Sequence, residues 1–121
     1  MRDEDVFRIE VDEETGPTPR MVLAVHGDLD YTHGDELGAV LDHQLALRDA
    51  AGRPLCVVVD LADVSYCDSC GLRVLLGAHR RVAGLGGELV LRGVSGQPRR
   101  ALRLTGLDTV LHATADLVEG S

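Results

Sequence analysis

The chain has 121 residues, 45% of them apolar, with three cysteines and a formal net charge of −8. This length suits one domain with its own apolar core, which needs neither a metal ion nor a disulfide bond for stability. The net negative charge argues against direct binding to nucleic acid. Residues Met1–Asp5 lack the apolar region of a signal peptide, and the run Leu55–Val59 is too short to span a membrane. We therefore expect a cytoplasmic protein with reduced thiols.

The first half of the chain predicts two strands and a helix. Residues 6–11 roughly alternate between apolar and polar side chains, and residues 21–25 predict a second strand that pairs antiparallel with the first. Thr32 is the predicted N-cap of a helix that Gly52–Pro54 ends. Its apolar residues recur at helical spacing. They are Leu37, Val40, Leu41 and Leu45.

The second half alternates strands with helices. Residues 55–59 form a continuous apolar run, typical of a strand buried on both faces, and residues 60–67 are predicted to be a connecting turn. The remaining predicted elements are a helix from about Ser69 that Gly84, Gly86 and Gly87 end, a strand over 88–91, a helix with Pro98 in its first turn that Gly106 ends, a strand over 110–112 and a helical turn over 115–119.

The predicted order of elements is β-β-α-β-α-β-α-β-α. It fills a single domain over residues 1–121, with a core at about 6–118. Strands that alternate with helices imply right-handed crossovers between parallel neighbours. The fold class is therefore α/β, with a mixed, mostly parallel sheet of four to five strands in which the first strand is antiparallel.

The turn that opens the helix at Ser69 contains the most informative motif, Asp68-Ser-Cys-Gly-Leu72. The free N–H groups and the dipole of a helix start favour an anion. The carboxyl edge of the sheet, where this serine is predicted to lie, commonly carries function in α/β folds. Asp and Ser are also ordinary capping residues, so spacing alone leaves both a functional and a purely structural interpretation open.

Four segments in the same order resemble the STAS family, the domain of anti-sigma factor antagonists and of sulfate-transporter tails. The longest, Val59–Arg81, is similar to the strand, the Asp-Ser-(Ser/Thr)-Gly-Leu motif and the helix of that family. The other three are Gly27–Asp30, Gly86–Leu91 and Leu104–Asp108. The resemblance implies a STAS fold and a protein-binding switch, with no enzymatic activity and no metal or other cofactor.

In bacterial members of this family, the serine directly after the aspartate is phosphorylated by an anti-sigma factor that is a serine kinase with a histidine-kinase-like ATPase domain. The unphosphorylated antagonist binds that kinase and so releases the sigma factor, and a metal-dependent serine phosphatase resets the system. By resemblance, Ser69 is the phosphoacceptor. The residues expected to contact the partner are Asp30, Asp68, Ser69, Cys70, Gly71 and Arg73.

Some of these residues carry a further expectation from the resemblance. Gly71 and Leu72 are expected to be structural, through a close backbone approach and a core contact respectively. Cys70 stands where the family commonly has a second hydroxyl. Arg73 replaces a small residue of some members, which predicts an effect on the choice of partner.

Two alternative interpretations remain open. Cys67 and Cys70 form a CxxC at a strand-to-helix turn, where a thioredoxin-like redox site also lies, although the aromatic and proline neighbours of such a centre are absent. A zinc site is less favoured, since it needs four ligands and the five histidines are scattered. In the second alternative the protein has the same fold but acts as a STAS scaffold subunit of a stress-signalling complex or of a lipid-transport ATPase.

Overall fold

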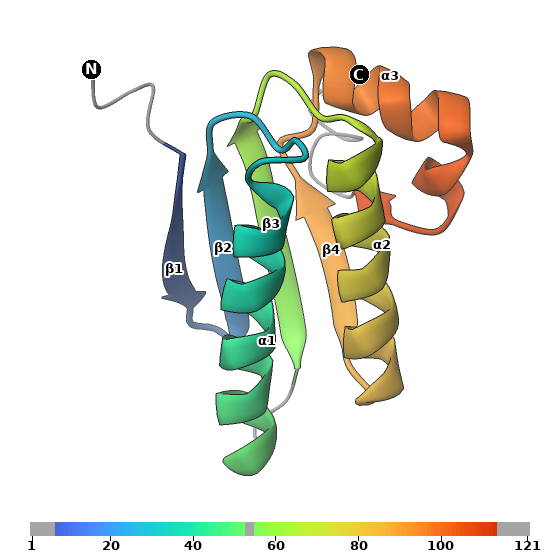
Figure 1. The fold of residues 1–121 in the computed structure, drawn as a ribbon. Helices are drawn as coiled ribbons and strands as arrows, with labels where there is room; N and C mark the ends of the chain where they lie inside the picture. Colours follow the sequence, from blue (N-terminus) through green and yellow to red (C-terminus); the bar gives the residue numbers. More distant parts are fainter. Residues whose placement is uncertain (1–6, 53–54, 114–121) are drawn as a thin grey trace.

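The computed structural model describes residues 7–52 and 55–113, which alternate strands and helices along the chain (Figure 1). The predicted helical turn over 115–119 lies outside these residues. The elements are β1 (Arg8–Glu14), β2 (Arg20–His26), α1 (Gly34–Ala50), β3 (Cys56–Asp63), α2 (Ser69–Gly84), β4 (Glu88–Arg92), α3 (Gly96–Thr105), the 3-10 turn η2 (Leu107–Thr109) and β5 (His112–Ala113).

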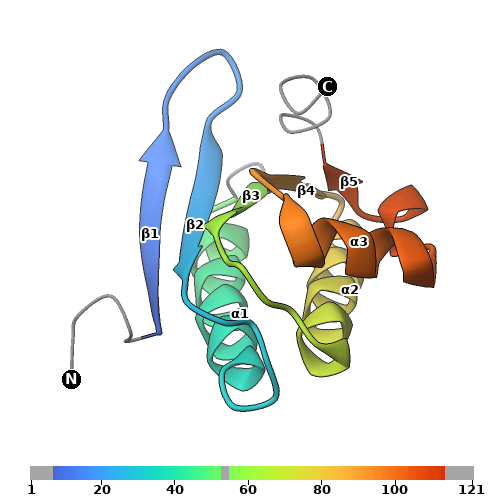
Figure 2. The same cartoon turned by 90° about the horizontal axis from the view of Figure 1, so that it is seen from above.

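The strands form one sheet in the order β1-β2-β3-β4-β5. β1 pairs antiparallel with β2, and every other neighbouring pair is parallel. Helices α1 and α2 lie side by side on one face of the sheet (Figure 2). This is the mixed, mostly parallel α/β sheet that the sequence predicts. Because β2 and β3 run in the same direction, the loops that follow them emerge at the same edge.

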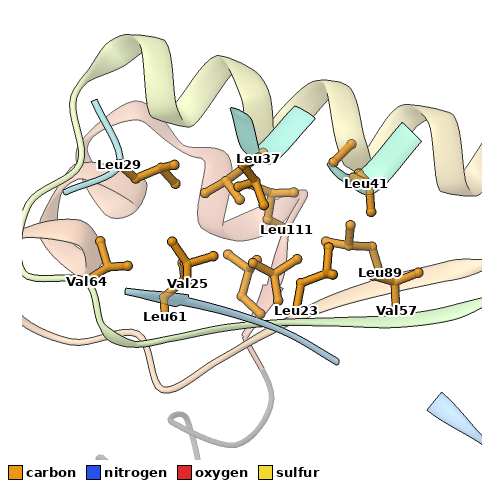
Figure 3. Packing of buried hydrophobic residues seen from close by; sticks show 14 of the residues in the cluster. Leu23, Val25, Leu29, Leu37, Leu41, Val57, Leu61, Val64, Leu89 and Leu111 are labelled. Carbon is orange, nitrogen blue, oxygen red and sulfur yellow. The ribbon is translucent and has the colours of Figure 1, made fainter. Parts of the chain in front are cut away.

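The main core lies between the sheet and the two helices (Figure 3). Alternate residues of β2, Met21, Leu23 and Val25, point into it because successive side chains of a strand face opposite sides. On α1, Leu37, Leu41 and Leu45 are buried as their spacing predicts, and Val40 packs partly buried beside them. A small second cluster lies on the other face of the sheet. It consists of Val22, Val58 and Val90.

The strand β3 is longer than its apolar run predicts. All of Val57–Val59 is buried, which confirms a strand covered on both faces, but pairing with β2 continues to Asp63. Leu61 keeps the inward alternation and is buried, so the strand persists through the polar residues around it. The predicted connecting turn is therefore shorter than expected. Likewise, β1 extends to Glu14 because its hairpin register with β2 holds to that residue.

The start of α1 differs from the prediction, since Thr32 is not its N-cap. His33 occupies that position and makes no side-chain capping bond. Asp30 explains the difference, because its carboxylate accepts from the Thr32 hydroxyl and amide and folds the preceding turn. At the other end of the chain, Gly106 ends α3 in the left-handed conformation, as predicted, with φ of 76°.

Candidate functional site

The loops after β2 and β3 continue the parallel pairing of those strands beyond their ends. Leu29 and Cys67 form an isolated parallel bridge. The Leu29 amide donates to the Tyr66 carbonyl at 3.0 Å, and the Asp68 amide donates to the Leu29 carbonyl at 3.3 Å. The Asp30 loop and the start of α2 are thereby held against each other. Residues that are 38 apart in the sequence lie on one surface at the carboxyl edge of the sheet.

Asp68 is the N-cap of α2 and also connects the two loops. Its Oδ1 accepts hydrogen bonds from the amides of Cys70 at 2.9 Å and Gly71 at 3.0 Å. Its other oxygen, Oδ2, accepts from the Tyr31 amide at 3.0 Å. A carboxylate in this position satisfies donors that the helix start leaves free. One side chain therefore both begins α2 and fixes the Asp30 loop beside it.

Ser69 is the first residue of α2 and is exposed. No residue in the described part of the chain forms a hydrogen bond with its hydroxyl. Cys70 is half-buried, and Arg73 lies one turn further along the helix, also exposed. The helix thus presents Ser69 and Arg73 to the solvent next to the Asp30 loop. The Ser69 hydroxyl is sterically and chemically free to receive a group.

Gly71 lies where two backbone segments come closest. A Cβ at this position would lie 2.2 Å from the Leu29 carbonyl oxygen and 2.9 Å from the Cys67 sulfur. No side chain fits there unless a loop moves. Leu72 is buried, 6% exposed, in the main core. The structural roles expected of Gly71 and Leu72, a close backbone approach and a core contact, are both confirmed.

Asp30 shapes its own loop. Its Oδ1 accepts from the Thr32 hydroxyl at 2.6 Å and from the His33 amide at 3.2 Å, and it pairs with His33 Nδ1 at 3.1 Å. The Thr32 hydroxyl bond is the main reason that the pKa of Asp30 lies below its ordinary value. The His33 ring also stacks on Phe7, with ring centroids 4.4 Å apart. The structure therefore places Asp30 in the loop beside Asp68, with its carboxylate engaged locally.

Three further residues at this surface were not identified from the sequence. Gln97 of α3 donates to the Cys67 carbonyl at 3.0 Å and accepts from the Cys67 amide at 2.8 Å. Tyr31 and Tyr66 are 75% and 44% exposed on the two loops. Tyr31 follows Asp30 and Tyr66 precedes Cys67 in the sequence, and the chain has few aromatic residues. Their positions could therefore have indicated this surface. Gln97 is 30 residues from Cys67 and carries no signal in the sequence.

The two cysteines of the CxxC differ in their surroundings. Cys67 is 2% exposed, and burial, with the Asp68 charge adding to it, raises the pKa of its thiol to about 12. A thiol with so high a pKa is almost entirely protonated at neutral pH and is a poor nucleophile. Cys67, Cys70 and Cys56 are all free. The geometry therefore disfavours a dithiol redox centre.

Replacing Cys70 with serine should leave partner binding and phosphorylation intact, since the two side chains are nearly equal in volume and Cys70 is half-buried. In the wild type, alkylation at neutral pH should modify Cys70 well before Cys67, because Cys67 is buried and protonated. Mass mapping of the alkylated peptides measures the order. Disulfide-reductase activity that disappears in Cys70→Ser would instead support a redox role.

Two other classes of site have no candidate among the described residues. No three of their His, Cys, Asp and Glu side chains come together in a way that could hold a metal ion. None of the helices in residues 7–52 and 55–113 combines the length and the apolar character that crossing a membrane requires.

The family model of the STAS domain matches residues 8–120. The chain belongs to this family. An anti-sigma-B factor antagonist from Staphylococcus aureus is 34% identical over 92 residues, which are 74% of this chain and 79% of the relative. This relative is an anti-sigma factor antagonist by name.

Another relative and a solved structure are also similar to this chain. The anti-sigma-B factor antagonist of Listeria monocytogenes is 42% identical over 53 residues, so the match spans 44% of this chain and about half, 46%, of the relative. The crystal structure of an anti-sigma factor antagonist from Mycobacterium paratuberculosis superposes with a TM-score of 0.74 at 23% identity, covering 93% of this chain and 89% of the other. At that identity the superposition establishes the fold.

Proposed function

We propose that this protein is an anti-sigma factor antagonist whose binding to an anti-sigma factor is switched by a phosphate on Ser69. The supporting observation is the exposed hydroxyl of Ser69 at the first position of α2, with no bond from the described residues. Asp68 and Gly71 hold this position rigidly against the Asp30 loop. The unphosphorylated surface binds the anti-sigma factor, which then releases its sigma factor.

The covalent step belongs to the partner, a serine kinase with a histidine-kinase-like ATPase domain. The Ser69 oxygen attacks the γ-phosphorus of ATP, the bond from that phosphorus to the bridging oxygen breaks, and ADP leaves. The hydroxyl proton passes to a base of the kinase. The carboxylates of Asp68 and Asp30 are already engaged with backbone amides. This chain accordingly acts in the cytoplasm as a substrate and binding surface, with no catalysis of its own.

Removal of the phosphate restores the binding surface. A metal-dependent serine phosphatase hydrolyses the phosphoester, so that water supplies the new oxygen on phosphorus and Ser69 recovers its proton. The exposure of Ser69 at the helix start gives both enzymes access to the same atom. The described structure needs no rearrangement for either reaction.

Incubation with the cognate anti-sigma kinase and ATP should add one phosphate, on Ser69. Ser69→Ala should abolish incorporation, because the only acceptor oxygen at the helix start is then lost. Ser65 is a suitable control, since it is also exposed and lies four residues earlier, on the segment that leads into α2. Ser65→Ala should be phosphorylated like the wild type. Intact-mass and peptide mass measurements detect the phosphate, and its presence in Ser69→Ala would contradict the assignment.

A further inference from the structure

We propose that Arg73 is the built-in counter-charge of a phosphate on Ser69, forming a salt bridge within α2 when that serine is modified. The inference rests on the proposed function, because it requires a phosphate at this position. It adds a regulatory role for a residue outside the Asp68–Leu72 motif. The role follows from where α2 places the two side chains and from what their neighbours already bind.

The spacing of Ser69 and Arg73 is that of a favourable helical ion pair. They are four residues apart on α2, so they occupy the same helix face, about 6 Å apart along the axis. Both are exposed. The anion would be N-terminal to the cation, which is the better orientation for such a pair. Helical side chains also lean toward the N-terminus, which directs Arg73 toward Ser69.

Two amides of the helix start are already occupied, so a phosphate there depends largely on the helix dipole for compensation. Asp68 Oδ1 occupies the amides of Cys70 and Gly71, so these donors are unavailable to a phosphate. Asp68 itself is negative, and the Asp30 carboxylate lies in the adjoining loop. A phosphate of about two negative charges would therefore meet a negative surface unless a cation is supplied.

Arg73 is available to supply that charge. No ion pair joins it to any of the described residues, whereas Arg81 on the same helix pairs with Asp42 at 2.6 Å. Arg73 lines a groove of about 530 Å³ between α1 and α2, with Asp35 on the opposite helix. Asp35 is exposed and carries one charge, so a phosphate on the same helix competes well for the guanidinium. Arg80 is similarly exposed and unpaired among these residues, but it lies about 16 Å from Ser69 along the helix.

The test is a ³¹P NMR titration of protein that carries phosphoserine introduced at position 69 during translation. No kinase is needed, so failure of the proposed function would appear separately, as absent phosphorylation by the kinase. In Arg73→Ala the second pKa of the phosphate should rise by about 0.3–0.6 units above that of the wild type. Arg73→Lys should stay close to the wild type because it retains the charge. The matched control Arg80→Ala should equal the wild type, because Arg80 lies beyond the screening length at physiological salt.

Equal pKa values in Arg73→Ala and the wild type would overturn the proposal. So would equal increases in Arg73→Ala and Arg80→Ala, which would indicate a change in overall charge and no specific pair. The difference between the wild type and Arg73→Ala should shrink at 1 M salt, where screening acts within about 3 Å. A difference that persists undiminished there would also contradict a salt bridge. Circular dichroism confirms that each variant is folded before the titration is compared.

Discussion

Protein phosphorylated on Ser69 should bind its anti-sigma factor about ten- to a thousandfold more weakly than the unmodified protein. Phosphoserine carries about −1.5 to −2 charges near neutral pH. A partner surface that is complementary to an unmodified hydroxyl must either desolvate that charge or lose its contact with Ser69, and both weaken binding. One unit-charge pair at about 4 Å contributes about 1 kcal/mol in water and about 4 kcal/mol at an effective dielectric of 20, and each 1.4 kcal/mol is about tenfold in affinity.

The fold should be unchanged by this modification, because Ser69 is exposed and its hydroxyl bonds to none of the described residues. Calorimetric titration of both forms against the anti-sigma factor, with circular dichroism of each, separates affinity from folding. Ser69→Asp has less charge and bulk than phosphoserine, so it should lose less affinity. Equal affinities of the two forms would refute the switch. A loss of affinity together with unfolding would be consistent with Ser69 as the phosphorylated residue but would contradict the electrostatic mechanism.

Gly71→Ala should lower the free energy of unfolding by about 2–3 kcal/mol, although alanine is normally the better helix former. The added Cβ would overlap the Leu29 carbonyl oxygen at 2.2 Å and crowd the Cys67 sulfur. Neither the backbone oxygen nor the buried sulfur can move away by a change of rotamer, so the Leu29 loop must separate from the start of α2. That separation would also displace Ser69 from the Asp30 loop, and partner binding should weaken with stability.

Gly84→Ala is the matched control, since Gly84 lies on the same helix and a Cβ there meets no atom within 4 Å. Its stability should equal or slightly exceed that of the wild type. Urea denaturation followed by circular dichroism measures both variants. If Gly71→Ala were as stable as Gly84→Ala, the close approach of the Leu29 loop would not constrain the site.

The alternation of strands and helices along the chain could be predicted because apolar periodicity determines it locally. Leu37, Leu41 and Leu45 define the buried stripe of α1 on spacing alone. Strand ends were less predictable. β3 continues to Asp63 because its neighbour β2 supplies a parallel partner. The apolar pattern within one strand does not indicate how far its pairing with a neighbour extends.

The site could be located from its motif, but its internal contacts could not. Asp and Ser were both possible capping residues at this helix start, and in the structure Asp68 is the N-cap. The two bonds between Gln97 and Cys67 join residues 30 apart and arise from tertiary folding, so no local pattern indicates them. The bond between Asp30 and Thr32 is local, and it takes up the Thr32 side chain that was expected to cap α1. The functional role of Ser69 itself remains a prediction, carried by family resemblance and by its exposure.

If a kinase acts on Ser69 as proposed, the bridge between Leu29 and Cys67 and the Gln97 bonds shape the surface that it meets. The epitope is discontinuous, because the residues around the serine come from three separate stretches of the chain. A synthetic peptide covering residues 60–76 contains the whole motif yet lacks Leu29 and Gln97. A kinase matched to this surface should therefore ignore the peptide and the nascent chain, and modify only molecules that have finished folding.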